Sequence, residues 1–268
     1  MEKNAIKGRS LPETVLLSIR ARNERKAKAT PRKRVNGAEI VVASYNVHKC
    51  IGTDRRFDPE RTARVIREMS PDVIALQEAD NRFGDRAGLL DLARLELETG
   101  LVPVPVSGNG KGHGWRGNVL LFKRGTVRDV HQIKLPGLEP RGALVAEIDL
   151  DEKRTLRVIA AHLGLLRRSR SEQARVVLDI MSSADERPTL LLGDLNEWRL
   201  GNRSALNTLH TTFGPTPAVP TFPSGLPVLA LDRIMGNRHD LVSAVEAHDT
   251  PLSRVASDHL PLTAFVHL

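Results

Sequence analysis

Several apolar segments of this chain end abruptly in a carboxylate, amide or imidazole side chain. Residues 40–46 read IVVASYN, residues 72–78 read DVIALQE and residues 189–194 read TLLLGD. Short apolar runs of this kind predict buried β-strands. A polar residue at a strand end lies at the rim of a sheet, where α/β folds place their sites. The polar residues at these ends are Asn46, Glu78, His162, Asp194 with Asn196, Asp232, and Asp258 with His259.

Helical patterns are sparse between these strands. Asp58 and Pro59 predict an N-cap and a first helical turn, and Pro71 ends that helix. Further helices are expected over residues 89–98 and 171–183. Many strands with few helices favour an α/β sandwich of mixed sheets over a regular βαβ winding. Other strands are expected near residues 118–123, 127–135, 143–149 and 155–161, with two or three more after a proline-rich loop at 214–227.

The positive charge of the chain is concentrated near its N-terminal end. The 268 residues carry a formal net charge of +8, a value that suggests an anionic partner. Residues 1–38 hold 11 Lys or Arg and 3 Asp or Glu, whereas residues 39–268 are balanced at 29 and 29. We therefore expect a basic arm over 1–38, including a short helix, and a separate domain over 39–268. The arm is either a solvated segment or a contact for anionic lipid or nucleic acid.

The amino-acid composition limits the compartment and the type of partner expected for this chain. The single cysteine, Cys50, excludes an internal disulfide and favours a reducing, cytoplasmic location. We expect Cys50 to be a small buried thiol, because nothing pairs it with a catalytic base. No apolar run approaches the length of about 18 residues that a membrane span requires. Aromatic residues make up 3% of the chain, which is a poor supply for stacking on nucleic-acid bases.

The side-chain types at the strand ends suit a metal-dependent reaction at phosphorus. Carboxylate and amide oxygens without a cysteine cluster favour a hard cation, Mg²⁺ or Mn²⁺. Histidines beside carboxylates suit acid–base chemistry and contacts to phosphate oxygens. A carboxylate such as Asp194 can orient an attacking water, and a bound cation can stabilise charge on the leaving oxygen.

Motifs spaced in order along the chain resemble those of the endonuclease/exonuclease/phosphatase superfamily, the deoxyribonuclease I-like phosphohydrolases. The resemblance covers residues 40–268 and implies a four-layer α/β sandwich with two packed mixed sheets and a catalytic domain that hydrolyses phosphoester bonds. The pairing of Gly-Asp-x-Asn with Ser-Asp-His-x-Pro is its most specific part. The motifs are Ser44-Tyr45-Asn46-Val47, Leu76-Gln77-Glu78, Gly117-Asn118, His162-Leu163, Gly193-Asp194-Leu195-Asn196, Leu231-Asp232-Arg233-Ile234 and Ser257-Asp258-His259-Leu260-Pro261.

The resemblance also implies roles for individual residues. The metal would be held by Glu78, with Asn46 and Asp258 beside it. Asp194 would orient or deprotonate the attacking water. His259, held by Asp232, would engage the scissile phosphate.

Contacts to the substrate are implied for His162 and Asn196, with Asn118 supporting the site. Arg141 lies at the start of another expected strand. Its guanidinium either holds a phosphate bidentately or forms a structural salt bridge.

The sequence leaves the substrate open. A general phosphodiesterase or phosphatase acting on a lipid or inositol phosphate is our first interpretation, because the domain carries no net charge. A DNA endonuclease or exonuclease is the alternative, and it would follow several phosphates with basic residues. A non-catalytic binding module is a third interpretation, disfavoured because no motif position is lost. Candidates for a basic track are Lys111, Arg116, Arg167, Arg168 and Arg170.

Overall fold

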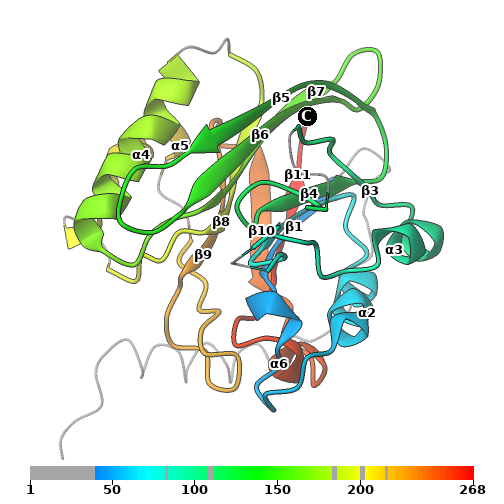
Figure 1. The fold of residues 1–268 in the computed structure, drawn as a ribbon. Helices are drawn as coiled ribbons and strands as arrows, with labels where there is room; N and C mark the ends of the chain where they lie inside the picture. The colour runs from blue at the N-terminus through cyan, green and yellow to red at the C-terminus, as the bar shows by residue number, and fades with distance from the viewer. Residues whose placement is uncertain (1–39, 82–83, 108–110, 183–185, 200–202, 215–216) are drawn as a thin grey trace, which may run out of the picture. The chain divides into compact units, whose positions relative to one another are not determined.

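The computed structural model describes residues 40–81, 84–107, 111–182, 186–199, 203–214 and 217–268. The basic arm and its short helix, expected within residues 1–38, lie outside these ranges. Along the described chain, the strands form one sheet of six strands and one of five (Figure 1). No helix in these ranges combines the length and the apolar character needed to cross a membrane.

The first sheet has a parallel pair of strands at its centre. Strands β1 and β2 run parallel, with Asn46 opposite Gln77, and the other neighbours are antiparallel. Glu78 therefore follows directly beside Asn46 at the same rim of the sheet. In spatial order the strands are β10 (Val242–Ala247), β11 (Leu262–Val266), β1 (Ile40–Asn46), β2 (Val73–Gln77), β4 (Val119–Phe122) and β3 (Val102–Pro103).

The second sheet also contains one parallel pair. Strands β7 and β8 run parallel with His162 opposite Asp194, and β8 and β9 run antiparallel with Asp194 opposite Asp232. The register thus sets His162, Asp194 and Asp232 side by side. In spatial order the strands are β5 (Thr126–Lys134), β6 (Gly142–Asp149), β7 (Thr155–His162), β8 (Thr189–Asp194) and β9 (Asp232–Gly236).

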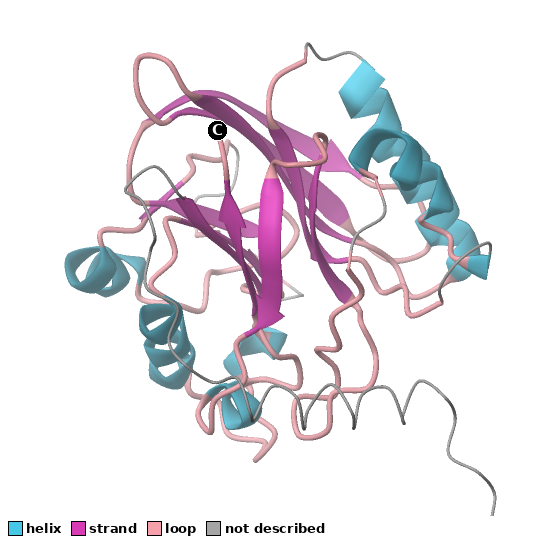
Figure 2. Ribbon diagram, turned by 180° about the vertical axis from the view of Figure 1, so that it is seen from behind, coloured by secondary structure: helices cyan, strands magenta, loops and turns pink. Residues whose placement is uncertain are grey.

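Three apolar clusters divide the domain into four layers. The first lies between the sheets and joins side chains such as Val42 and Leu120 to Leu144 and Leu192. The second packs the outer face of the first sheet against α2 (Pro59–Met69) and α3 (Leu92–Thr99). The third packs the outer face of the second sheet against α4 (Arg167–Ser182) and α5 (His210–Phe213). Helices cover both outer faces of the sheet pair (Figure 2), so the predicted four-layer sandwich is confirmed.

The helix boundaries follow local capping. Asp58 accepts a hydrogen bond from the Arg61 N–H and Pro59 opens α2, as predicted. The helix expected at 89–98 begins at Leu92 instead, because Asp91 is its N-cap and accepts from the Arg94 N–H. The helix expected at 171–183 begins earlier, at Arg167. Its first turn buries polar side chains, so apolar periodicity did not mark it.

Candidate active site

Three polar side chains lie side by side at one end of the second sheet. His162 and Asp232 flank Asp194 in register, and all three are buried. Gly193 makes this close arrangement of strands possible, because a Cβ at that position would lie 1.8 Å from the carbonyl oxygen of Ala161. A glycine directly before Asp194 is thus a packing requirement of the strand.

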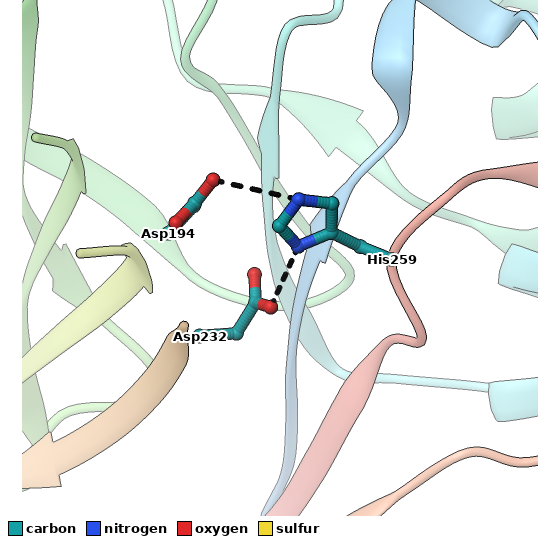
Figure 3. A group of neighbouring side chains, drawn as sticks. All are labelled: Asp194, Asp232 and His259. Atoms are coloured by element: carbon teal, nitrogen blue, oxygen red, sulfur yellow. Dashed lines mark hydrogen bonds and ion pairs between the residues drawn. The ribbon is translucent and has the colours of Figure 1, made fainter. Parts of the chain in front are cut away.

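His259 reaches this row from the loop before β11. Its Nδ1 lies 2.8 Å from Asp232 Oδ2, and its Nε2 lies 3.8 Å from Asp194 Oδ2 (Figure 3). Thr221 Oγ1 also donates to Asp232 Oδ2, at 2.5 Å, and the ring of Phe222 packs 4.9 Å from the imidazole. Burial disfavours a charged imidazole, but the carboxylates of Asp232 and Asp194 outweigh it and raise the pKa of His259. The two carboxylates therefore favour the protonated imidazole.

Asp194 is held from both sheets. Asn46 Nδ2, at the end of β1, donates to Asp194 Oδ2 at 2.9 Å, and the Asn196 N–H donates to Asp194 Oδ1 at 2.9 Å. Burial raises the pKa of the Asp194 carboxyl, with the negative charge of Asp232 adding to the effect and the positive charge of His259 opposing it. Asn196 has a positive φ of 52° and donates its Nδ2 to the Leu163 carbonyl. These contacts fix the carboxylate between the two sheets.

Arg141 fixes which ring nitrogen of His162 carries the proton. Its Nη1 lies 2.9 Å from His162 Nδ1, and a guanidinium can only donate, so Nδ1 accepts and the ring proton sits on Nε2. Nε2 lies 3.4 Å from Asp194 Oδ2. The Nε and Nη2 groups of Arg141 both donate to Glu139 Oε2, at 2.9 and 2.7 Å. Of the two interpretations for Arg141, the structure therefore favours the salt bridge over a fork held open for phosphate.

Asn118 is buried beside the start of β6. Its Nδ2 donates to the carbonyls of Trp115 and Gly142, at 3.2 and 3.0 Å. Gly142 directly follows Arg141, so Asn118 supports the strand that carries this arginine. Its Oδ1 is buried and has no hydrogen-bond partner among the described residues.

Glu78 and Asp258 each face a basic side chain from the turn η1 (His48–Cys50). Lys49 Nζ lies 3.0 Å from Glu78 Oε2, and His48 Nδ1 lies 3.7 Å from Asp258 Oδ1. Burial opposes ionisation of Glu78, yet Lys49 outweighs it and lowers the pKa of this carboxyl. Glu78 has a φ of 53°, and the three turn residues have φ between 45° and 57°. Left-handed conformations of non-glycine residues concentrate at functional sites, where the surrounding structure enforces them.

These two carboxylates are the ones that the family resemblance implies for a cation. Their donors are oxygen atoms, as Mg²⁺ and Mn²⁺ prefer, and the Lys49 ammonium on Glu78 shows that the carboxylate attracts a cation. Asn46 Oδ1 accepts from the His48 N–H at 3.1 Å and retains a second acceptor position. The residues predicted to hold a metal therefore offer donor atoms of the type that a hard divalent ion prefers.

A second group has ligand atoms close enough for a metal. Asp194, Asp232 and His259 each offer an atom within 4.8 Å of the others. His259 Nδ1 is committed to a hydrogen bond of 2.8 Å with Asp232 Oδ2, and Thr221 Oγ1 donates to the same oxygen. These ligand atoms already pair with one another, so we interpret the group as a hydrogen-bonded charge network.

Other residues at the site were missed or misplaced by sequence reasoning. Thr221 lies in the proline-rich loop, and Lys49 follows Asn46 by three residues with no recognisable pattern. Arg170 was expected on a basic track, but the structure corrects this: it is buried and pairs with Glu197. Cys50 is buried, as expected.

Comparisons with known proteins show the family of the chain. The model of the Endonuclease/Exonuclease/phosphatase family matches residues 43–259. The chain belongs to this family. Members are typically hydrolases of phosphoester bonds that use divalent metals.

Individual relatives show the extent of the likeness. The uncharacterized protein YbhP of Escherichia coli (strain K12) is 28% identical over 251 residues, which cover 85% of this chain and 96% of that protein. The crystal structure of an endonuclease/exonuclease/phosphatase from Beutenbergia cavernae matches with a TM-score of 0.65 and 24% identity, over 86% of this chain and 72% of that one. TDP2 of D. rerio, crystallised with a single-strand DNA product, matches with a TM-score of 0.60 and 17% identity, over 85% and 98%. The two structures show a shared fold.

Proposed function

We propose that this protein is a divalent-metal-dependent hydrolase of phosphoester bonds, in which Asp194 activates the attacking water. The observation that carries the proposal is the hydrogen bond of 2.9 Å from Asn46 to Asp194, which joins strand ends of both sheets at one buried carboxylate. Burial raises the pKa of this carboxyl. A general base works best when its pKa lies near the operating pH.

The proposed reaction is an in-line displacement at phosphorus. The water oxygen bonds to phosphorus, Asp194 takes the water proton, and the ester P–O bond on the opposite side breaks. His259 and His162 donate from Nε2 to phosphate oxygens; both Nε2 atoms lie within 4 Å of Asp194 Oδ2. Arg141 keeps the proton of His162 on Nε2. Asn196 positions Asp194 and contributes a further donor.

A divalent cation bound at Glu78, with Asp258 and Asn46 beside it, would supply positive charge that stabilises the phosphate and the departing oxygen. Lys49 would have to release Glu78 to admit it. The metal-ligand roles of these three residues and the substrate role of Asn118 stay predictions from the family resemblance.

A lipid or inositol phosphate remains our first proposal for the substrate, and the protein would then be a phosphodiesterase or phosphatase. Nucleic acid is the second proposal, and the protein would then be a nuclease. Burial of Arg170 removes one member of the expected basic track. In favour of the nuclease, Trp198 is half exposed two residues after Asn196, with the Arg199 guanidinium 4.4 Å from its ring. Such a platform suits base stacking. A cytoplasmic location and contact of residues 1–38 with anionic lipid or nucleic acid stay predictions from composition.

Hydrolysis of bis(p-nitrophenyl) phosphate with Mn²⁺ tests the reaction. Asp194→Asn and His259→Gln should each lower kcat by about 10²–10⁴, the usual contribution of acid–base groups. Asp129→Asn and His131→Gln are matched controls, because this ion pair lies exposed on β5. EDTA should abolish turnover and excess Mn²⁺ restore it. Normal turnover in the Asp194 and His259 variants would rule out the proposal.

A further inference from the structure

A cleft beside Glu78 is lined by more positive than negative side chains. Its volume is about 360 Å³, counting space open to solvent, and it also borders Arg141 and His162 of the candidate active site. Lys49, Arg86 and Arg116 complete its basic lining, whereas Glu78 and Asp80 are its acidic members. A cleft of this kind attracts anions.

Ion pairs account for most of these charges. Arg86 binds Asp80 through two hydrogen bonds of 2.8 and 3.1 Å, and Lys49 pairs with Glu78. Arg141 pairs with Glu139, which is not among the residues that line the cleft. Each carboxylate that would repel an anion is therefore already neutralised by a neighbouring cation.

Arg116 is the exception among the cleft residues. Within the described part of the chain, no carboxylate or other acceptor pairs with its guanidinium, and its Nε is buried without a hydrogen-bond partner. The lone positive charge in the lining thus belongs to Arg116.

The structure holds the Arg116 side chain in place. The guanidinium carbon lies 5.2 Å from the ring centroid of Trp115, and a Cβ at Gly142 would lie 2.9 Å from Arg116 Cδ. The absence of a side chain at Gly142 therefore leaves the space through which the arginine passes. Trp115 is itself fixed by a hydrogen bond of 2.9 Å from Nε1 to the Ile133 carbonyl. Little side-chain freedom remains to be lost on binding, which favours affinity.

We propose that Arg116 is the anchor of a second anion subsite, which binds a phosphate group of the substrate other than the one hydrolysed. Its free Nη groups suit the two-oxygen contact that guanidinium makes with phosphate. The subsite adjoins Glu78 and His162, so a single substrate with two phosphates can reach both places at once. This inference rests on the proposed function and narrows the substrate to compounds with at least two phosphates. The second phosphate belongs either to a nucleotide or to a phosphorylated inositol ring.

Calorimetric binding in EDTA tests the subsite without turnover. The probes are thymidine 3′,5′-bisphosphate against thymidine 5′-monophosphate, and inositol 1,4-bisphosphate against inositol 1-phosphate. The wild-type protein should bind the bisphosphate of at least one pair about tenfold more tightly, the effect of one good charged contact. A preference within the thymidine pair alone identifies a nucleotide, and one within the inositol pair alone identifies an inositol phosphate.

Variants separate this contact from general electrostatics. Arg116→Gln should reduce the preference to less than about threefold, and Arg116→Lys, which keeps the charge but not the fork, should retain part of it. Arg128→Gln is the matched control, because Arg128 is 58% exposed on β5 and pairs with Asp149. Thermal unfolding checks that the variants fold.

The outcomes distinguish the two proposals. Equal affinity for both members of each pair in the wild-type protein, or an unchanged preference in Arg116→Gln, would overturn the subsite. Because binding is measured without metal or hydrolysis, a lack of turnover with bis(p-nitrophenyl) phosphate would count against the proposed function alone.

Discussion

Replacing Glu197 by glutamine is expected to destabilise the domain strongly, although it changes only one atom. Glu197 and Arg170 are almost fully buried, with side-chain exposures of 0% and 2%. Glu197 Oε1 accepts from the Arg199 N–H at 2.9 Å, and Oε2 accepts from the Ala205 N–H at 2.8 Å and from Arg170 Nη2 at 3.4 Å. Glutamine has one acceptor oxygen, so its amide group would face at least one of these donors.

The magnitude follows from the charge that is left behind. Removing one partner of a buried ion pair costs about 3–5 kcal/mol. We expect the lower value, about 3 kcal/mol, because the contact is long and Arg170 also donates to the carbonyls of Gly164 and Leu165. For a domain of this size the midpoint of thermal unfolding should fall by about 6–12 °C.

Urea unfolding followed by tryptophan fluorescence measures this loss. Glu172→Gln is the matched control; it breaks an exposed pair with Arg168 and should cost less than about 0.5 kcal/mol. Arg170→Met combined with Glu197→Gln should be less destabilising than the sum of the two single changes, because no buried charge remains unpaired. A loss for Glu197→Gln as small as that of the control, or strict additivity in the double variant, would refute the reasoning.

Three further predictions concern other parts of the domain. The pKa of His259 is raised in the folded protein, so the stability that its positive charge contributes is fully present below the free pKa of about 6.5 and is lost as pH rises through the raised pKa. Asp232→Asn removes one of the carboxylates that raise this pKa and should shift the alkaline limb of the pH–rate profile to lower pH. An unmoved limb would contradict this. Burial raises the pKa of the Cys50 thiol to about 11, so a disulfide reagent at pH 8 should label Cys50 only after unfolding, and rapid labelling of the native protein would show that it is accessible. Asp58→Ala removes the cap on the Arg61 N–H and should cost about 1 kcal/mol in urea unfolding; no change would mean that the cap is dispensable.

The strand ends that carry the candidate site were predictable because the signal is local. His162 and Asp194 each close an apolar run, and the parallel register of β7 and β8 then brings them abreast. Asp58 and Pro59 likewise predict the start of α2 from neighbouring residues alone. Short-range features of this kind do not depend on how the distant parts of the chain pack.

The position and partners of a side chain could not be predicted where those partners lie far away in the sequence. Arg170 lies in the run RRSRSE, which we expected to contribute to a basic track, yet it is buried, where it contacts Glu197 and the carbonyls of Gly164 and Leu165. Thr221 reaches Asp232 from an irregular loop whose path no periodicity describes. The sequence left two interpretations of Arg141 open, a phosphate contact and a structural salt bridge. The position of Glu139 beside the guanidinium of Arg141 favours the salt bridge.

The pairing of β1 with β11 has a consequence for how the domain folds. Ile40 lies opposite Val266, so the first described strand cannot complete its hydrogen bonds until a segment from the other end of the domain arrives. Contacts between such distant residues slow folding, because a long loop must close before any of them stabilises the chain. His259 enters on the same segment. We therefore expect refolding measured by fluorescence and the return of hydrolysis to follow one slow phase, since no partly folded chain holds both sheets and the complete set of catalytic groups.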